Sequence, residues 1–463
     1  MDEHERALRA TIEQPQTPPL WRGRENRVNK PSPGGGEMIT QTERADVVVV
    51  GAGPTGLTAA ARLAQLGVAH VVVDADVGPT RESRAALLHA ATLEILDEVG
   101  VAGELIAAGV RVNRIGFCDR GRIIAQIGLA GVPSRYQFAL GVPQSTTEQV
   151  LVARLGALGG SIRRGHRAGK VTPAPGGYLV TGTGPAEAGA APFAIGARYV
   201  IGCDGAHSIV RSAAGLGFPG STYPSQFVLA DAVLASPPGP DDEARIFTSP
   251  HGVVVTGRLP SGNHRVVATV DAGVAVPDPP GRDFLDAILR ERGVGQLAAD
   301  PVWSSRFRVA RRVADRFRAG GVFVCGDAAH VHSPAGGQGM NTGIADAYDL
   351  ATRLGAVLTG QADQAILDGY ERDRRAAALE VVTFTDRMTT MASVRSPAAR
   401  ALRDAALAAA SRIPAIRNLI TLWVSGLKRS PLRHDLPPLK PARLPQPATY
   451  DPPRGARHEH ARG

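Results

Sequence analysis

The chain has 463 residues, 43% hydrophobic and 21% charged, which is typical of a globular protein of roughly two to four domains. The formal net charge is +9, but the tail from Leu436 onwards has five basic and two acidic residues and so supplies a third of the excess. The three cysteines lack the short spacing of disulfide or metal sites, no signal peptide begins the chain, and no apolar run reaches the ~20 residues of a membrane helix. We therefore expect a cytoplasmic protein without a metal, membrane or nucleic-acid partner.

Both ends of the chain have the composition of disordered segments. Residues 1–43 are rich in proline and glycine, and prolines dominate again in residues 434–463. Three glycines and a glutamate precede Met38, and their G-rich codons resemble a bacterial ribosome-binding site. Two interpretations stay open: translation starts at Met38, or the residues before it are a genuine extension.

The ordered part begins with alternating strands and helices. Val47–Val50 is a short apolar run typical of a buried parallel strand, Leu57–Leu66 has helical spacing, and His70–Asp74 is the next strand. The apolar positions of Ala85–Val99 also recur at helical spacing and predict a helix. This order is typical of a parallel sheet with crossover helices.

Later stretches have a different pattern. Residues 111–140 and 218–308 contain short alternating runs separated by turn sequences, which predict antiparallel strands joined by hairpins. Other elements predicted from periodicity are helices at residues 148–158, 341–357 and 365–425 and strands at residues 199–202 and 321–325.

The sequence Gly51-Ala52-Gly53-Pro54-Thr55-Gly56 follows the first strand and opens the first helix. Gly51 permits a tight turn, Gly53 lets the backbone approach a pyrophosphate, and Gly56 lets helix and strand pack closely. The helix N-terminus presents amide hydrogens to the phosphates, and Asp74 at the end of the next strand suits a ribose diol. A nucleotide site is predicted, although this unit does not distinguish FAD from NAD.

A second string with the same glycine spacing, residues 215–220, is interpreted differently. It follows a helical stretch rather than a strand, and Pro219 would disrupt a helix opening there. This string therefore predicts a turn.

Two later segments carry a resemblance to a known family. Gly202-Cys203-Asp204-Gly205, followed by Ser208 and Arg211, resembles the DG motif of the group A flavoprotein aromatic hydroxylases, and Gly326-Asp327-Ala328-Ala329-His330 resembles their GD motif. This family includes p-hydroxybenzoate and phenol hydroxylases, and the likeness is greatest to the branch that hydroxylates aromatic polyketides and rifamycin-type antibiotics. The resemblance covers about residues 44–390 and implies FAD as the cofactor.

The resemblance assigns roles to individual residues. In the family, the aspartate matching Asp204 lies near FAD and the pyridine nucleotide, the one matching Asp327 contacts the ribityl chain, and the proline matching Pro334 lies beside the substrate. Amides at the following helix start can stabilise the anionic end of reduced flavin. The residues expected to bind cofactor are Gly51, Gly53, Pro54, Gly56, Asp74, Arg84, Gln144, Asp204, Asp327, Pro334, Gly337, Gly339, Met340 and Asn341.

Structural alternatives stay open for several of these residues. Asp204 suits an ordinary helix cap, Arg84 a surface position and Gln144 a strand end. His330 and His332 have no metal partner at a useful spacing and are expected to make structural hydrogen bonds.

The resemblance also implies an α/β fold: a Rossmann-like FAD-binding domain, an inserted antiparallel β-sheet substrate domain and a C-terminal helical segment. Many relatives carry a further thioredoxin-like domain at the C-terminus, which is not expected here. The boundaries expected are residues 44–110, 141–217 and 309–360 for the FAD-binding domain, 111–140 and 218–308 for the substrate domain, and 361–433 for the helices, between the terminal segments 1–43 and 434–463.

The chemistry implied by the resemblance is monooxygenation. NADPH or NADH reduces non-covalently bound FAD, O2 forms a C4a-hydroperoxyflavin, and one oxygen atom passes to an aromatic or polyphenolic small molecule such as a polyketide or antibiotic. The flavin carries the chemistry, so no catalytic side chain is assigned. Baeyer–Villiger oxidation and a non-catalytic, ligand-sequestering flavoprotein remain as alternatives, and both a monomer and a homodimer are compatible with the sequence.

Overall fold

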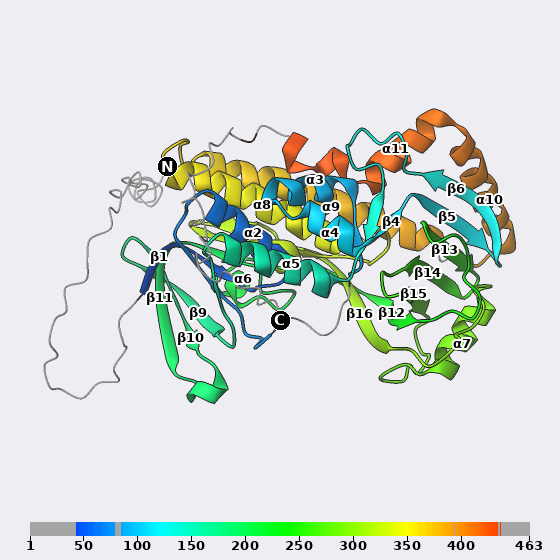
Figure 1. Cartoon of the computed structure of the whole chain (residues 1–463), viewed down its shortest axis with the longest axis horizontal. Coiled ribbons are helices and arrows are strands. Elements are labelled where there is room, and N and C mark those ends of the chain that lie inside the picture. The colour runs from blue at the N-terminus through cyan, green and yellow to red at the C-terminus, as the bar shows by residue number, and fades with distance from the viewer. Residues whose placement is uncertain (1–42, 79–84, 393, 434–435, 437–463) are drawn as a thin grey trace, which may run out of the picture.

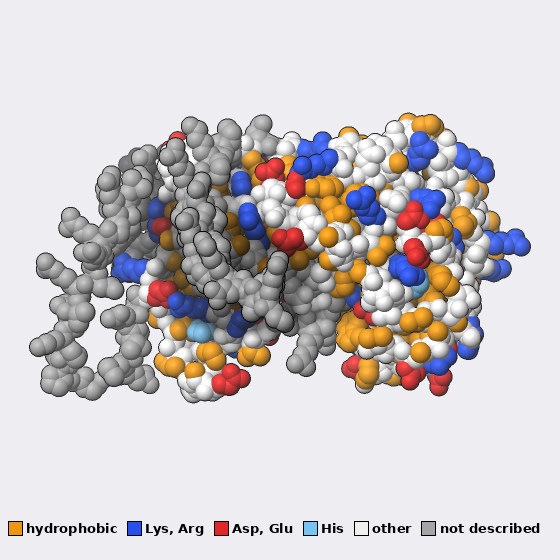
Figure 2. Space-filling model, in the orientation of Figure 1, with side chains coloured by type: hydrophobic (Ala, Val, Ile, Leu, Met, Phe, Trp, Pro, Cys, Tyr) orange, Lys and Arg blue, Asp and Glu red, His pale blue; other side chains and the backbone are white. Residues whose placement is uncertain are grey.

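The computed structural model describes residues 43–78, 85–392, 394–433 and 436, so the expectations for both termini, including Met38, lie outside the described residues. Two large sheets lie toward opposite ends of the long axis and are connected by long helices (Figure 1). In the described ranges, no helix combines the length and apolarity needed to cross a membrane, and no cluster of potential metal ligands occurs. On the described surface that is visible in Figure 2, basic and acidic side chains are interspersed.

The first sheet is built on a parallel core. Strand β1 pairs in parallel with β11 and β2, and β11 pairs in parallel with β18. In spatial order the strands are β17 (Arg318–Ala319), β18 (Val322–Val324), β11 (Pro192–Gly202), β1 (Glu43–Val50), β2 (His70–Val73) and β8 (Ile162–Arg163), with β10 (Gly177–Thr183) and β9 (Arg167–Ala174) continuing from β11.

Four consecutive valines of β1 explain how both faces of this sheet are covered. Val47 and Val49 pack into the core shared with the helices, whereas Val48 and Val50 pack into a second core under β9 and β10. Successive side chains of a strand point to opposite faces, so an all-apolar run marks a strand buried on both sides. The helices on the first face are α2 (Pro54–Gln65), α3 (Ala90–Val99), α4 (Ala102–Ala108), α5 (Gln144–Ala157), α8 (Gln338–Leu358) and α9 (Ile366–Ala392).

The second sheet is antiparallel except where β13 and β5 pair in parallel. Helix α7 (Arg282–Glu291) covers one face through a core that includes Val228 and Leu285. In spatial order the strands are β19 (His330–Val331), β16 (Trp303–Val313), β12 (Gly220–Ala232), β15 (His264–Val270), β14 (Gly252–Arg258), β13 (Glu243–Ser249), β5 (Arg114–Asp119) and β6 (Arg122–Gly128).

The helix predicted over Ala85–Val99 is wrong in its first turn. Helix α3 begins at Ala90, because Leu87 and Leu88 form strand β3, which pairs with β7 (Ala139–Gly141) in a small sheet that also contains β4 (Val110–Val112). No helix opens at residues 215–220: Gly215 lies in a turn, residues 216–219 have no regular secondary structure, and Gly220 begins β12. Helices α10 (Pro397–Arg412) and α11 (Pro414–Val424) then lead to the short turns η3 (Leu427–Arg429) and η4 (Pro431–Arg433).

Candidate functional site

The glycine-rich turn between β1 and α2 is tight on one side and open on the other. A Cβ atom at Gly51 would lie 2.3 Å from the carbonyl oxygen of Cys203, and one at Gly56 would lie 1.9 Å from that of Gly51. At Gly53, no atom lies within 4 Å of the Cβ position. Helix α2 starts at Pro54 with no side-chain cap and no acidic residue in its first turn. Its free amides and positive dipole end therefore suit a pyrophosphate.

Asp74 follows β2 and lies against the same turn. Its carboxylate accepts hydrogen bonds from the backbone nitrogen of Ala52 and, at 2.8 Å, from that of Asp76. Nη1 of Arg164 lies 3.6 Å from the carboxylate, and the side chain remains 12% exposed. Asp74 thus braces the turn while part of its carboxylate stays accessible.

The loop that carries the GD motif, residues 326–330 (the GD loop), packs against the glycine-rich turn at Thr55. The Thr55 hydroxyl lies 2.7 Å from the Cβ position of Gly326 and 2.4 Å from that of Gly343 in α8, so larger residues at these two sites would clash. Asp327 lies exposed in the short turn η2 (Gly326–Ala328). Close packing of glycines around one hydroxyl therefore brings three segments, remote in sequence, to one place.

Asp346 of α8 is a buried carboxylate behind the GD loop that accepts hydrogen bonds from three different segments. It accepts hydrogen bonds from the His330 ring at 2.6 Å, from Nε of Arg374 at 2.8 Å and from the backbone nitrogen of Gly326 at 3.2 Å. Burial opposes ionisation, but the charges and hydrogen bonds of His330 and Arg374 outweigh it and hold the pKa of Asp346 below its ordinary value. His330 therefore makes a structural hydrogen bond, as expected from the sequence.

The first turn of α8 is a second uncapped helix start. Gly337 is its N-cap, with a φ of +62°, and donates its backbone N–H to the carbonyl of Pro334 at 2.9 Å. No side chain caps the helix, its first turn holds no acidic residue, and the Cβ position of Gly339 has no neighbour within 4 Å. Met340 is half-buried beside it. This open surface, formed by backbone amides, suits an anionic group.

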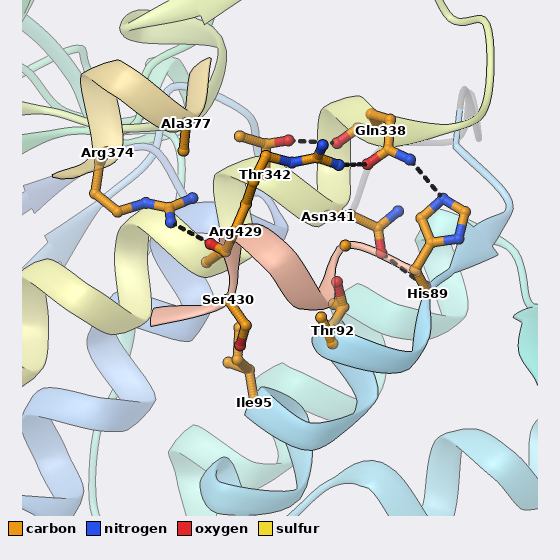
Figure 3. Close-up of a pocket in the computed structure, with 13 residues that line it drawn as sticks. His89, Thr92, Ile95, Gln338, Asn341, Thr342, Arg374, Ala377, Arg429 and Ser430 are labelled. Carbon is orange, nitrogen blue, oxygen red and sulfur yellow. Dashed lines mark hydrogen bonds between the residues drawn. The ribbon is translucent and has the colours of Figure 1, made fainter. Parts of the chain in front are cut away.

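Asn341 fixes the shape of that turn. Its side-chain nitrogen donates to the carbonyls of Gly337 at 2.7 Å and Leu87 at 2.8 Å, and its oxygen accepts from the backbone nitrogen of His89 at 2.8 Å (Figure 3). The amide nitrogen and oxygen of the Asn341 side chain thus both bond to the protein backbone. Asn341 therefore positions the loop and leaves the backbone of the turn to face a ligand.

Arg211 connects the loop that carries the DG motif, residues 202–208 (the DG loop), to the GD loop through hydrogen bonds. Its guanidinium donates to the carbonyl oxygens of Ala206 and Ala328, each at 2.9 Å. Asp204 accepts from two backbone amides at the start of α6 (Ile209–Ala213), as a helix cap does. Burial raises the pKa of Asp204, and these hydrogen bonds partly offset the rise.

Two of the residues expected to bind cofactor remain, Gln144 and Arg84, and only Gln144 lies within the described residues. Its backbone nitrogen donates to the carbonyl of Ala85 at 3.0 Å, and its side-chain nitrogen donates to Glu148 at 2.9 Å. Gln144 is the first residue of α5 and not a strand end. Arg84 lies outside the described residues, although the adjoining Ala85 lies against Gln144.

Two histidines near the loop at Pro334, the buried His89 and the half-buried His332, predict how stability depends on pH. Burial lowers the pKa of His89 and of His332 from 6.5 to about 4. The unfolded chain therefore binds more protons than the folded chain between these values, so stability is full above pH 6.5 and falls as the pH drops toward 4. We expect a loss of up to about 3 kcal/mol for each group. Urea unfolding between pH 4 and 7 measures this loss of stability. A free energy of unfolding that does not change with pH would contradict the prediction. The variant His89→Gln should show a smaller change of stability with pH than the wild type.

On the second sheet, an aromatic pair faces away from α7. Val228 packs toward α7, so the adjacent Phe227 points to the other face, where its ring stacks on Phe307 with centroids 5.7 Å apart. Two polar residues of the same sheet region have acidic partners: His251 lies 3.5 Å from Glu291, and Arg258 lies 3.1 Å from Asp241.

Sequence reasoning missed Thr55, Asp346 and Arg374. Asp346 was a usable signal, because it lies among apolar residues of a predicted helix and buried charges are almost always paired; Arg374 stands in the charged run 371–375 and gave no such signal. Nothing in the sequence pointed to Thr55, since its role depends on the approach of two distant glycines.

Comparison with known proteins agrees with this geometry. A family model described as an FAD binding domain matches residues 44–385. Rifampicin monooxygenase from Streptomyces venezuelae is 34% identical over 346 residues, which cover 73% of this chain and 70% of that protein. The 6-methylpretetramide 4-monooxygenase of Streptomyces rimosus is 34% identical over 369 residues, covering 78% of this chain and 65% of that protein.

The fold has solved counterparts. The structure of p-nitrophenol 4-monooxygenase from Pseudomonas putida aligns with a TM-score of 0.76 at 27% identity, covering 84% of this chain and 98% of the other. The segment after residue 385, which contains α10, α11 and the final turns, lies beyond the family match.

Proposed function

This chain is a member of the FAD-binding-domain family of aromatic monooxygenases, and from this premise we propose that it hydroxylates a polyphenolic polyketide or an antibiotic of similar size, with NADPH or NADH as electron donor. The observation that carries the proposal is that Thr55, in the first turn of α2, packs against the GD loop at Gly326 and against α8 at Gly343, so that two helices with uncapped N-termini pack together beside the GD loop. When bound, FAD supplies electron transfer from the nicotinamide and activation of O2.

The residues present fit FAD along its length. The open side of Gly53 and the amides of α2 are proposed to hold the pyrophosphate, with Pro54 presetting the helix start and Asp74 on the adenosine ribose. Asp327 is proposed for the ribityl chain, and Gly339 and Met340 for the polar edge of the flavin ring. Arg84, Gln144 and Asp204 are proposed as further contacts.

The protein contributes position, charge and exclusion of water. Asn341 and Gly337 shape the first turn of α8, so its amides face the site without reorganising when charge develops there. Arg211 and Asp346 hold the DG and GD loops from behind. Each of these groups orients backbone donors rather than taking part in bond making, as expected where the cofactor carries the chemistry.

The substrate is proposed to lie between the loop at Pro334 and the face of the second sheet that carries Phe227 and Phe307. Ser333, next to Pro334, hydrogen-bonds Thr389 of α9 at 2.8 Å, so this helix borders the same region. The stacked rings of Phe227 and Phe307 suit a planar ring system. The relatives named for rifampicin and for a pretetramide support a large aromatic substrate.

Oxidation of NADPH and NADH by the FAD-loaded protein in aerated buffer tests the proposal, with a panel of polyphenols and aromatic antibiotics. We expect one class of compound to accelerate oxidation many-fold and to gain one oxygen atom by mass. Protein stripped of FAD is the control and should be inactive. Oxygen insertion beside a ketone, seen by NMR of the product, would contradict hydroxylation, and binding without any turnover would contradict the enzymatic role.

A further inference from the structure

Arg429 lies directly behind the first turn of α8, in the segment beyond the family match. It is the last residue of η3 and only 7% exposed. Its Nη2 donates to the side-chain oxygen of Gln338 at 3.3 Å and to the carbonyl of Trp423 at 3.1 Å, and Figure 3 shows it directed at Gln338. The guanidinium carbon lies 4.8 Å from the centre of the Trp423 ring. Arg429 is therefore held in one place by neutral partners.

No carboxylate forms an ion pair with Arg429 among residues 43–78, 85–392, 394–433 and 436. Its Nη1 and the hydroxyl of Ser430 have no hydrogen-bond partner, and both residues line a cavity between α3, α8, α9 and η3. This cavity has room for about one water molecule. Buried charges are normally paired, so an unpaired one acts strongly on its surroundings.

The charge persists under working conditions. Burial lowers the pKa of Arg429 to about 10, which still leaves the guanidinium protonated at neutral pH. The neighbouring Arg374 is neutralised by Asp346 at 2.8 Å, and Lys428 is exposed and lies 3.8 Å from Glu380. Arg429 thus hydrogen-bonds the first residue of α8 and makes no ion pair within the described ranges, although the more distant Glu380 favours its charge.

Gln338, the partner of Arg429, is the first residue of α8, immediately before Gly339 and Met340. The positive end of the helix dipole and the charge of Arg429 therefore act in the same direction. We propose that Arg429 is a positioning residue that acts through Gln338 to strengthen binding of anionic reduced FAD relative to oxidised FAD. This inference rests on the proposed function, because it assumes the polar edge of the flavin at this helix start.

The midpoint potential of the bound FAD, measured by equilibration with a reference dye, tests the inference. Arg429→Met removes the charge, and Gln338→Glu pairs it with a carboxylate while keeping the arginine. For each, we expect reduced FAD to bind roughly tenfold more weakly relative to oxidised FAD, a shift of about 30 mV to lower potential. Arg429→Lys keeps the charge and should retain most of the wild-type potential.

Lys428→Met is the matched control, since it removes a charge one residue away that is exposed to solvent and should leave the potential unchanged. A wild-type potential in Arg429→Met and Gln338→Glu would overturn the inference. If Arg429→Met does not fold, Arg429→Gln removes the charge in its place, because a carboxylate at residue 338 would lower the potential by itself. Failure of the wild-type protein to bind FAD would instead overturn the proposed function, so the two failures are distinguishable.

Discussion

Replacing Gly53 with valine is expected to leave the protein folded but to weaken FAD binding by about 100-fold. Gly53 has a φ of −76° and a ψ of −176°, which a β-branched residue adopts without strain, and its Cβ would touch nothing in the protein. In the proposed site, however, the added methyl groups would occupy the space of the pyrophosphate. Thermal unfolding of the FAD-free protein and FAD titration by fluorescence measure the two effects separately.

Gly56→Ala is the matched control, because its added atom meets the protein instead of the ligand. Its Cβ would lie 1.9 Å from the carbonyl oxygen of Gly51, so the FAD-free protein should lose about 1–3 kcal/mol of stability. Normal FAD affinity in Gly53→Val would contradict the placement of the pyrophosphate at this turn. Equal destabilisation of both variants would show that the open side of Gly53 is not open in solution.

Asp346→Asn is expected to destabilise the folded protein by about 3–5 kcal/mol, because it leaves the buried guanidinium of Arg374 without its counter-charge. The change also weakens the acceptor for Gly326, so FAD affinity should fall together with stability. Urea unfolding of the variant at neutral pH measures the first effect, and fluorescence titration measures the second.

Asp368→Asn provides the comparison for this prediction. Asp368 pairs with Arg318, but its side chain is 78% exposed, so its removal should cost no more than about 1 kcal/mol. Adding Arg374→Met to Asp346→Asn should recover part of the lost stability, since the unpaired charge is then gone. A loss for Asp346→Asn no larger than that for Asp368→Asn would contradict the role of Asp346 as a buried counter-charge.

Periodicity was sufficient to predict the regular elements that carry the site. The four valines of β1, the glycine-rich turn and the apolar strand before Asp327 each have one dominant local pattern, and the structure confirms a strand, a helix start and a strand there. The error at Leu87 and Leu88 has a tertiary cause. These residues fit the helical spacing, but pairing with β7 satisfies their backbone groups in a strand.

The parts of the site that depend on distant contacts were beyond prediction from the sequence. Asp204 was open between a ligand contact and a helix cap; the structure shows it accepting hydrogen bonds from two amides at the start of α6, whose N-cap residue is Ser208, and its part in cofactor binding stays a proposal. Arg429 lies 91 residues from Gln338, and no local pattern indicates that these side chains meet. Such pairs follow from how α8 and the C-terminal turns pack.

Turnover under isotopically heavy oxygen gas tests the central claim most directly, with the compound that stimulates NAD(P)H oxidation as substrate. We expect the product to carry one heavy oxygen atom on an aromatic carbon, and turnover to require bound FAD. A product whose added oxygen comes from water, or a product formed without FAD, would contradict the assignment of this chain as an FAD-dependent aromatic hydroxylase.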